Sequence, residues 1–168
     1  MKFYLVDRIE SIQPGKRIVA VKALSLAEEY LADHFPAFPV LPGVLMLESL
    51  VQAAAWLLRI EQGWSKSLIE LAEARNVRYG NFVVPGQTLR SEAELVKVAG
   101  DTATFKGVGR VAGDRQAVQG RLTLRSLNVA DVCPSAAAAD GRILAQLKER
   151  FRLVGGPEAL ARAEAGAD

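Results

Sequence analysis

The stretch from Pro42 to about Gln62 is apolar on every side, and this feature constrains the fold more than any other part of the sequence. Its apolar residues are Val44, Leu45, Leu47, Leu50, Val51, Ala53, Ala54, Ala55, Trp56, Leu57 and Leu58. A helix that is apolar all round is surrounded by protein rather than lying on a surface. A membrane span is disfavoured because Glu48, Gln52 and Arg59 interrupt the stretch, and one central acidic residue costs roughly 2.5 to 3.5 kcal/mol on insertion scales. The stretch therefore predicts the central helix of a soluble domain.

Residues with a period of two predict a sheet that covers this helix. Strands are expected at 17–23 before the helix and at 68–79, 89–98, 103–112 and 117–125 after it. Residues 3–9 are expected to form a short first strand or a turn. The four later strands suggest an antiparallel meander. The whole pattern predicts an α+β fold in which an antiparallel sheet wraps around one long central helix.

Two helical segments are expected outside the central helix. Ser25 and Glu28 have the spacing of a capping box, which predicts a short helix leading toward Asp33. Beyond residue 133 the sequence is rich in alanine and charge, and Asp140 is expected to cap a helix over 143–151. The segment from 158 to 168 has little to bury and is expected to be loosely held.

Composition excludes several classes of function. The 168 residues carry 21 basic and 19 acidic side chains, which gives a formal charge of +2. This small excess of positive charge falls short of the concentrated basic patch usual in nucleic-acid-binding proteins. Cys133 is the only cysteine, so neither an intramolecular disulfide nor a multi-cysteine metal site can form within one chain. The apolar stretch before Asp7 is too short for a secretory signal. A cytoplasmic protein with no membrane span is therefore expected.

The start of the central helix lacks the usual side-chain cap. Pro42 suits the first helical position, but Leu41 offers no acceptor for the free N–H groups of Gly43, Val44 and Leu45. Such an end can bind an anion, or a carbonyl oxygen that becomes negative during a reaction, and Gly43 leaves room for close approach. Alternatively, water or a neighbouring loop satisfies these N–H groups.

His34 and Glu48 are the candidate catalytic residues. His34, the only histidine, is the natural proton acceptor near pH 7, and a stiff proline loop follows it. Glu48 shares a helix face with Gln52 among apolar residues, surroundings that favour a neutral carboxylic acid. With the Gly43 N–H as enolate stabiliser, the two could remove a proton beside a carbonyl and expel a hydroxyl. Alternatively, Glu48 is partly solvated or ion-paired with Arg59. Because His34 and Glu48 are well separated along the chain, a second copy could supply one of them.

The sequence HFPAFPVLPGVLMLESLVQ resembles the motif of the 3-hydroxyacyl-acyl-carrier-protein dehydratases of fatty-acid synthesis, the FabZ-type hot-dog enzymes. His34, Gly43 and Glu48 stand at the positions of that family's histidine, glycine and glutamate. A weaker second match is NVRYGNFVVPGQTL, a strand leading to a Pro-Gly turn. The resemblance covers roughly residues 1 to 130.

This resemblance implies a hot-dog domain over residues 1–132, followed by a C-terminal helical extension with a loose tail over 133–168. It implies a homodimer with an acyl tunnel between the protomers, and leaves open whether a trimer of dimers forms. His34 would remove the proton beside the thioester, Glu48 of the partner would protonate the departing 3-hydroxyl, and the Gly43 N–H would bind the thioester oxygen. The implied partner is an acyl carrier protein bearing a 3-hydroxyacyl chain. No metal or organic cofactor is implied.

One part of the motif departs from the family pattern. Ala37 and Phe38 stand where Gly-His is common, and Phe38 either lines the acyl tunnel or only packs the loop. Phe38 and Val44 join Gly43 as the candidate substrate-binding residues.

The alternative functions are a hot-dog thioesterase or enoyl-coenzyme A hydratase, and a non-catalytic acyl-binding subunit.

Overall fold

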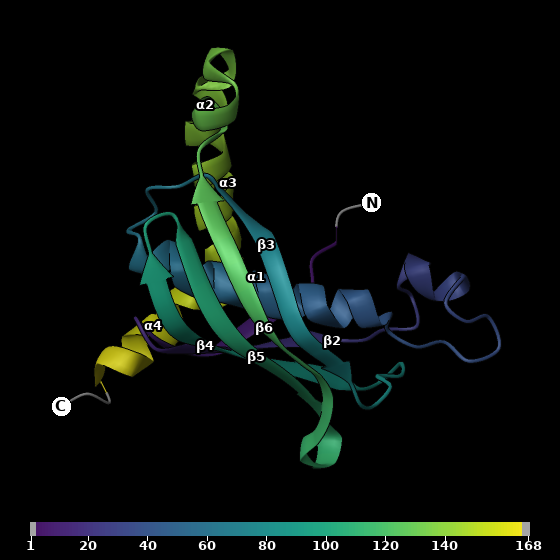
Figure 1. The fold of residues 1–168 in the computed structure, drawn as a ribbon. Coiled ribbons are helices and arrows are strands. Elements are labelled where there is room, and N and C mark those ends of the chain that lie inside the picture. The colour runs from purple at the N-terminus through teal and green to yellow at the C-terminus, as the bar shows by residue number, and fades with distance from the viewer. Residues whose placement is uncertain (1–2, 166–168) are drawn as a thin grey trace.

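The computed structural model describes residues 3–165, in which one six-stranded antiparallel sheet curves around helix α1 (Figure 1). The strands, in the sheet order β1-β2-β4-β5-β6-β3, are β1 (Arg8–Gln13), β2 (Arg17–Ala23), β4 (Thr88–Ala99), β5 (Thr102–Val111), β6 (Arg115–Leu127) and β3 (Leu68–Tyr79). The helices are α1 (Gly43–Glu61), α2 (Val129–Val132), α3 (Ala138–Leu153) and α4 (Gly156–Ala165), with 3₁₀ turns η1 (Glu29–Ala32), η2 (Ala112–Asp114) and η3 (Pro134–Ala136). The predicted α+β fold, a sheet wrapped around a long central helix, is confirmed.

Most of the predicted strands are correct, but their neighbours in the sheet are not all as expected. The predictions for 17–23 and 68–79 match β2 and β3. The meander holds for β4, β5 and β6 only, because β3 pairs with β6 and forms an edge of the sheet. The strand expected at 3–9 was misplaced, since β1 begins at Arg8. The chain before it instead passes α1, where the Leu5 N–H donates to Gln52 Oε1 at 2.9 Å.

Helix α1 is largely apolar because the sheet covers it from one side, while the N-terminal segment and α3 pack on it elsewhere. Leu50, Leu57 and Leu58 have no exposed surface, and neither do the alanines between them, Ala53 and Ala54. Within residues 3–165, α1 is the one helix long and apolar enough to cross a membrane, and 61% of its apolar window is buried inside the fold. Its burial against the sheet accounts for its composition.

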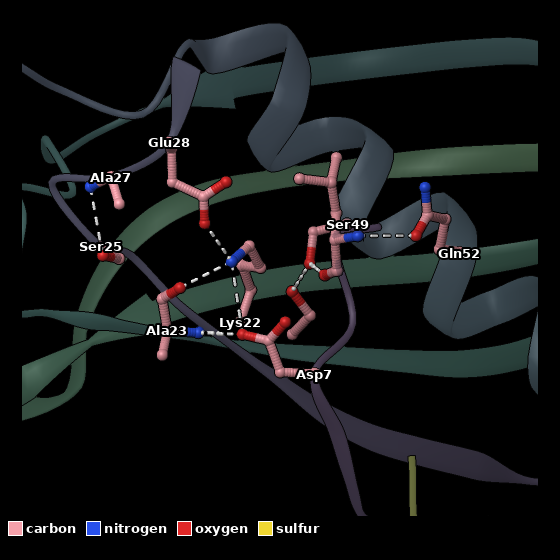
Figure 2. A network of polar contacts seen from close by, with 10 residues as sticks. Asp7, Lys22, Ala23, Ser25, Ala27, Glu28, Ser49 and Gln52 are labelled. Atoms are coloured by element: carbon pink, nitrogen blue, oxygen red, sulfur yellow. Dashed lines mark hydrogen bonds and ion pairs between the residues drawn. The ribbon is translucent and has the colours of Figure 1, made fainter. Parts of the chain in front are cut away.

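A buried lysine holds the segment that leads toward the proline loop (Figure 2). Lys22 is 5% exposed, and its Nζ donates to Glu28 Oε1 at 2.6 Å and to Asp7 Oδ2 at 3.3 Å. The predicted capping box between Ser25 and Glu28 is therefore wrong, because the buried ammonium takes the Glu28 carboxylate. Ser25 Oγ instead accepts from the Ala27 N–H, and only the short η1 turn forms.

The C-terminal extension packs back onto the central helix. Phe151 of α3 is 5% exposed, and its ring lies 5.7 Å from that of Trp56 and 5.4 Å from that of Trp64. Ala159 of α4 is 1% exposed and belongs to the same core. Residues 158–165 were expected to be loosely held, and this was wrong because α4 buries an apolar face next to β1. Residues 166–168 of that expectation lie outside the described residues.

Asp140 also differs from its predicted role. It lies in the first turn of α3 rather than ahead of the helix, and its carboxylate accepts from the N–H groups of Val129 at 2.7 Å and Ala130 at 3.1 Å. Ser67 Oγ donates to the same carboxylate. Asp140 therefore caps α2 from a neighbouring helix, because the chain reversal through η3 brings α3 beside the start of α2.

Candidate active site

The proline loop places His34 beside the start of α1. The His34 carbonyl accepts from the Val40 N–H at 3.1 Å, and the Leu41 N–H donates to Val83 O at 2.9 Å, which ties the end of the loop to the chain before β4. His34 is half-buried, and its ring stacks on that of Phe35 with centroids 4.2 Å apart. This loop therefore has one defined path even though it contains no regular helix or strand.

His34 and Gly43 line the same cavity, of about 300 Å³. The other residues around it are Phe35, Val40, Leu41, Met46, Tyr79, Gly80, Asn81 and Phe82. A Cβ added to Gly43 would come within 3.1 Å of the Tyr79 ring, so a larger residue at the helix start would require this ring to shift. The cavity combines an imidazole, a helix N-terminus and a largely apolar wall.

The N–H groups at the helix start are partly free, as expected. No side chain caps α1, and among the described residues no acceptor bonds the N–H of Gly43 or Val44. The expectation for Leu45 was wrong, because its N–H donates to Pro42 O at 2.9 Å. This bond forms when the first turn of the helix tightens. The N–H groups of Gly43 and Val44 thus remain available to bind a ligand, and Gly43 itself lines the His34 cavity.

Glu48 lies one turn further along α1 and is held by Gln52. Gln52 Nε2 donates to Glu48 Oε1 at 3.0 Å and to Phe3 O at 3.0 Å, while its Oε1 accepts from the Leu5 N–H. The dashed line that ends at the Gln52 side chain in Figure 2 marks the bond from the Leu5 N–H. Because both ends of the amide are engaged, Gln52 presents one fixed donor to the Glu48 carboxylate.

Glu48 faces a different cavity from His34. This second cavity, of about 200 Å³, runs beside α1 and is lined by Glu48, Gln52, Trp56 and Arg59 together with Phe3, Tyr4, Val6, Val51, Ala55, Ile69, Leu147 and Arg150. No ion pair joins Glu48 to Arg59 in the described part of the chain. The Arg59 guanidinium instead lies 5.4 Å from the centre of the Trp56 ring. Within one chain, the two candidate catalytic residues therefore face separate cavities.

The remaining candidates lie at the surface beside the first cavity. Phe38 is 51% exposed and packs edge-on against Phe82, with ring centroids 5.6 Å apart. Val44 is 68% exposed on the first turn of α1. Neither lines the cavity that holds His34. Sequence reasoning did not select Tyr79 and Asn81 as lining residues.

Comparison with known proteins places the chain in a family. The model of the FabA-like domain matches residues 1–120. A relative from Clostridium kluyveri, a "3-hydroxyacyl-[acyl-carrier-protein] dehydratase FabZ", is 35% identical over 120 residues, which span 71% of this chain and 83% of the relative. The protein of the same description from Clostridium acetobutylicum is 39% identical over 120 residues (71% and 84%), and that from Geobacillus thermodenitrificans is 41% identical over 112 residues (67% and 77%).

Solved structures agree on the fold. The dehydratase heterocomplex ApeI:P from Xenorhabdus doucetiae superposes with a TM-score of 0.62 at 20% identity, covering 77% of this chain and 86% of that one. The PaaI protein of Escherichia coli superposes with a TM-score of 0.54 at 11% identity, covering 71% and 78%. These likenesses support the hot-dog fold alone. The domain match and the sequence relatives establish that this chain belongs to the FabA-like family, which it shares with the FabZ-type dehydratases.

Proposed function

We propose that this protein removes water from 3-hydroxyacyl chains carried by an acyl carrier protein, giving trans-2-enoyl thioesters in cytoplasmic synthesis of fatty acids or related lipids. The observation that carries the proposal is the cavity in which His34 lies beside the uncapped start of α1, with Gly43 in its wall. A base and backbone N–H donors at one small site suit removal of a proton next to a thioester carbonyl. The FabZ relatives support the same reaction.

In the proposed reaction, neutral His34 takes the proton from the carbon next to the thioester carbonyl. The electron pair moves into the carbonyl, and the Gly43 N–H stabilises the negative charge on its oxygen. When the pair returns, a double bond forms between the second and third carbons and the bond to the 3-hydroxyl breaks. Glu48 gives its proton to the departing oxygen, which leaves as water. His34 then holds one extra proton and Glu48 lacks one, so proton exchange with solvent restores both.

We further propose that the working unit is a homodimer in which His34 of one protomer meets Glu48 of the other. Support comes from the two separate cavities, because within one chain these residues do not face the same space. Strand β3 is a long edge of the sheet whose residues are mostly exposed, and such an edge is suited to pairing with another chain. Val44 and Tyr79, exposed near the start of α1, add apolar surface on the same side of the site.

Hydration of a short trans-2-enoyl thioester, the reverse reaction, tests the proposal. The thioester is presented on acyl carrier protein and separately on coenzyme A to the wild type, His34→Ala and Glu48→Gln. Each substitution is expected to lower turnover by about 10²- to 10⁴-fold, the usual contribution of an acid or base. Glu61→Gln, an exposed glutamate on the same helix, is the matched control and should keep full turnover.

Other outcomes point to other functions. Release of free thiol without hydration would identify a thioesterase. A preference for the coenzyme A thioester would favour an enoyl-coenzyme A hydratase. Acyl binding without turnover at any chain length, unaffected by His34→Ala, would indicate a non-catalytic acyl-binding subunit.

A further inference from the structure

The cavity that holds Glu48 ends at a buried cation. Arg59 is 9% exposed, and its Nε is buried and has no hydrogen-bond acceptor among the described residues. Among the described side chains, no carboxylate lies within ion-pairing distance of Arg59. Burial lowers the pKa of Arg59 to about 10, which still leaves it charged at neutral pH. A buried charge without a counter-ion is unfavourable, so this guanidinium is suited to receive an anion.

The geometry of α1 places this cation at the far end of the cavity from Glu48. The two residues are eleven positions apart, close to three helical turns, so they share one helix face about 16 Å apart along the axis. Gln52 and Trp56 lie between them on that face and also line the cavity. The Arg59 guanidinium lies over the Trp56 ring, one turn back toward Glu48, as expected for a helical side chain that leans toward the N-terminus. The cavity thus has an acid at one end and a cation at the other.

The C-terminal extension completes this end of the cavity. Leu147 and Arg150 of α3 contribute to its wall, and the Arg150 guanidinium lies 3.6 Å from the centre of the Tyr4 ring. Helix α3 is anchored beside it by Phe151, which packs on Trp56. The domain match ends at residue 120, so α3 lies outside the part of the chain that the family model describes. Arg150 therefore brings a second guanidinium to the cavity from the part of the chain after residue 120.

We propose that Arg59 binds a carboxylate at the distal end of the acyl chain, so that the substrates are acyl thioesters with an anionic far end. This inference rests on the proposed dehydratase function, since it assumes that Glu48 marks the reacting end of the chain. A guanidinium and a carboxylate match in charge and can form two parallel hydrogen bonds. The mostly apolar wall between Glu48 and Arg59 suits methylene groups.

The test compares two trans-2-enoyl thioesters of equal length on acyl carrier protein, one ending in a methyl group and one in a carboxylate. The measured quantity is the ratio of their kcat/KM values for hydration. The wild type should favour the carboxylate, and Arg59→Met should lower the ratio by about tenfold or more, the usual worth of a hydrogen bond to a charged group. Arg59→Lys should retain part of the preference. Arg121→Met, which removes an exposed arginine of β6, is the matched control and should leave the ratio unchanged.

Two results would overturn the proposal: a wild type without preference for the carboxylate, or an Arg59→Met variant in which both substrates lose activity equally. Turnover of the methyl-ended substrate tests the dehydratase function separately. If the wild type turns over neither substrate, calorimetric binding of saturated pantetheine thioesters still decides the question. Tighter binding of the carboxylate-ended compound by the wild type, lost in Arg59→Met, supports the site, and equal binding refutes it. Thermal unfolding of each variant identifies any that fails to fold, in which case Arg59→Lys carries the comparison.

Discussion

At the scale of single residues, Gln52 connects the N-terminal segment to the proposed acid. Its amide oxygen accepts from the Leu5 N–H, and its nitrogen donates to Phe3 O and to Glu48 Oε1. These contacts leave the amide no freedom to turn away from Glu48. Gln52 is therefore a positioning residue, which acts on the reaction through the carboxylate it orients.

We expect Gln52→Met to lower kcat for hydration about tenfold with little change in KM, because one hydrogen bond to the Glu48 carboxylate is lost. Steady-state kinetics measure this split. In a Glu48→Gln background the same substitution should cause little further loss, since both residues then act through one group. A fully additive loss would show that Gln52 works independently of Glu48. Gln146→Met, an exposed change on α3, is the control.

At the scale of elements, the extension is attached to the hot-dog sheet at two places. Phe151 packs against both Trp56 and Trp64, and the capping of α2 by Asp140 ties the start of the extension to Ser67 just before β3. The hydrogen bond from Ser67 is the main reason that the pKa of Asp140 lies below its usual value, and the N–H groups of Val129 and Ala130 act in the same direction. Both attachments place α3 where it forms part of the Glu48 cavity.

The lowered pKa of Asp140 makes part of the stability depend on pH. A carboxyl whose pKa is lower in the folded state stabilises the fold above its unfolded pKa, about 3.9, and this stabilisation is lost as the pH falls through the folded value. We expect Asp140→Asn to lower Tm at pH 7 and the difference from wild type to shrink below about pH 4. Thermal unfolding across this pH range measures it. Asp101→Asn, a change at an exposed aspartate in the turn between β4 and β5, is the control, and a gap between Asp140→Asn and the wild type that stayed constant in acid would contradict the linkage.

At the scale of the whole molecule, one chain presents two half-sites. His34 and the helix start face one cavity, and Glu48 faces another. Because β3 is an exposed edge, a two-fold dimer could extend the sheet and bring the half-sites of different chains together.

Mixing two inactive variants tests this arrangement. If His34 and Glu48 come from different protomers, a mixed dimer of His34→Ala and Glu48→Gln has one intact site. Co-expression of both in equal amounts should then restore about a quarter of the wild-type activity, from the two-fold symmetry of random dimers. The measurements are hydration rate and molar mass by light scattering, with each variant alone as control. If activity is not restored although mixed dimers form, each site belongs to a single chain.

Much of the fold followed from local patterns. The apolar stretch predicted α1, and the strands predicted at 17–23 and 68–79 have the bounds of β2 and β3. Alternation is clearest in β5 and β6, where burial of one face leaves a period of two in the sequence. Helix α4 was missed because its buried face is largely alanine and short. The capping box at Ser25 failed because Glu28 binds Lys22, a contact between side chains brought together by folding.

The sequence by itself therefore determined the central helix, the strands around it, the family and the residues from which a site can be built. Only the tertiary structure decided that β3 lies next to β6, that His34 and Glu48 face separate cavities, and that Arg59 lies buried over Trp56 without a carboxylate beside it among the described side chains. The physical reason is that periodicity records how deeply each residue is buried, whereas the identity of its neighbours depends on how distant segments pack.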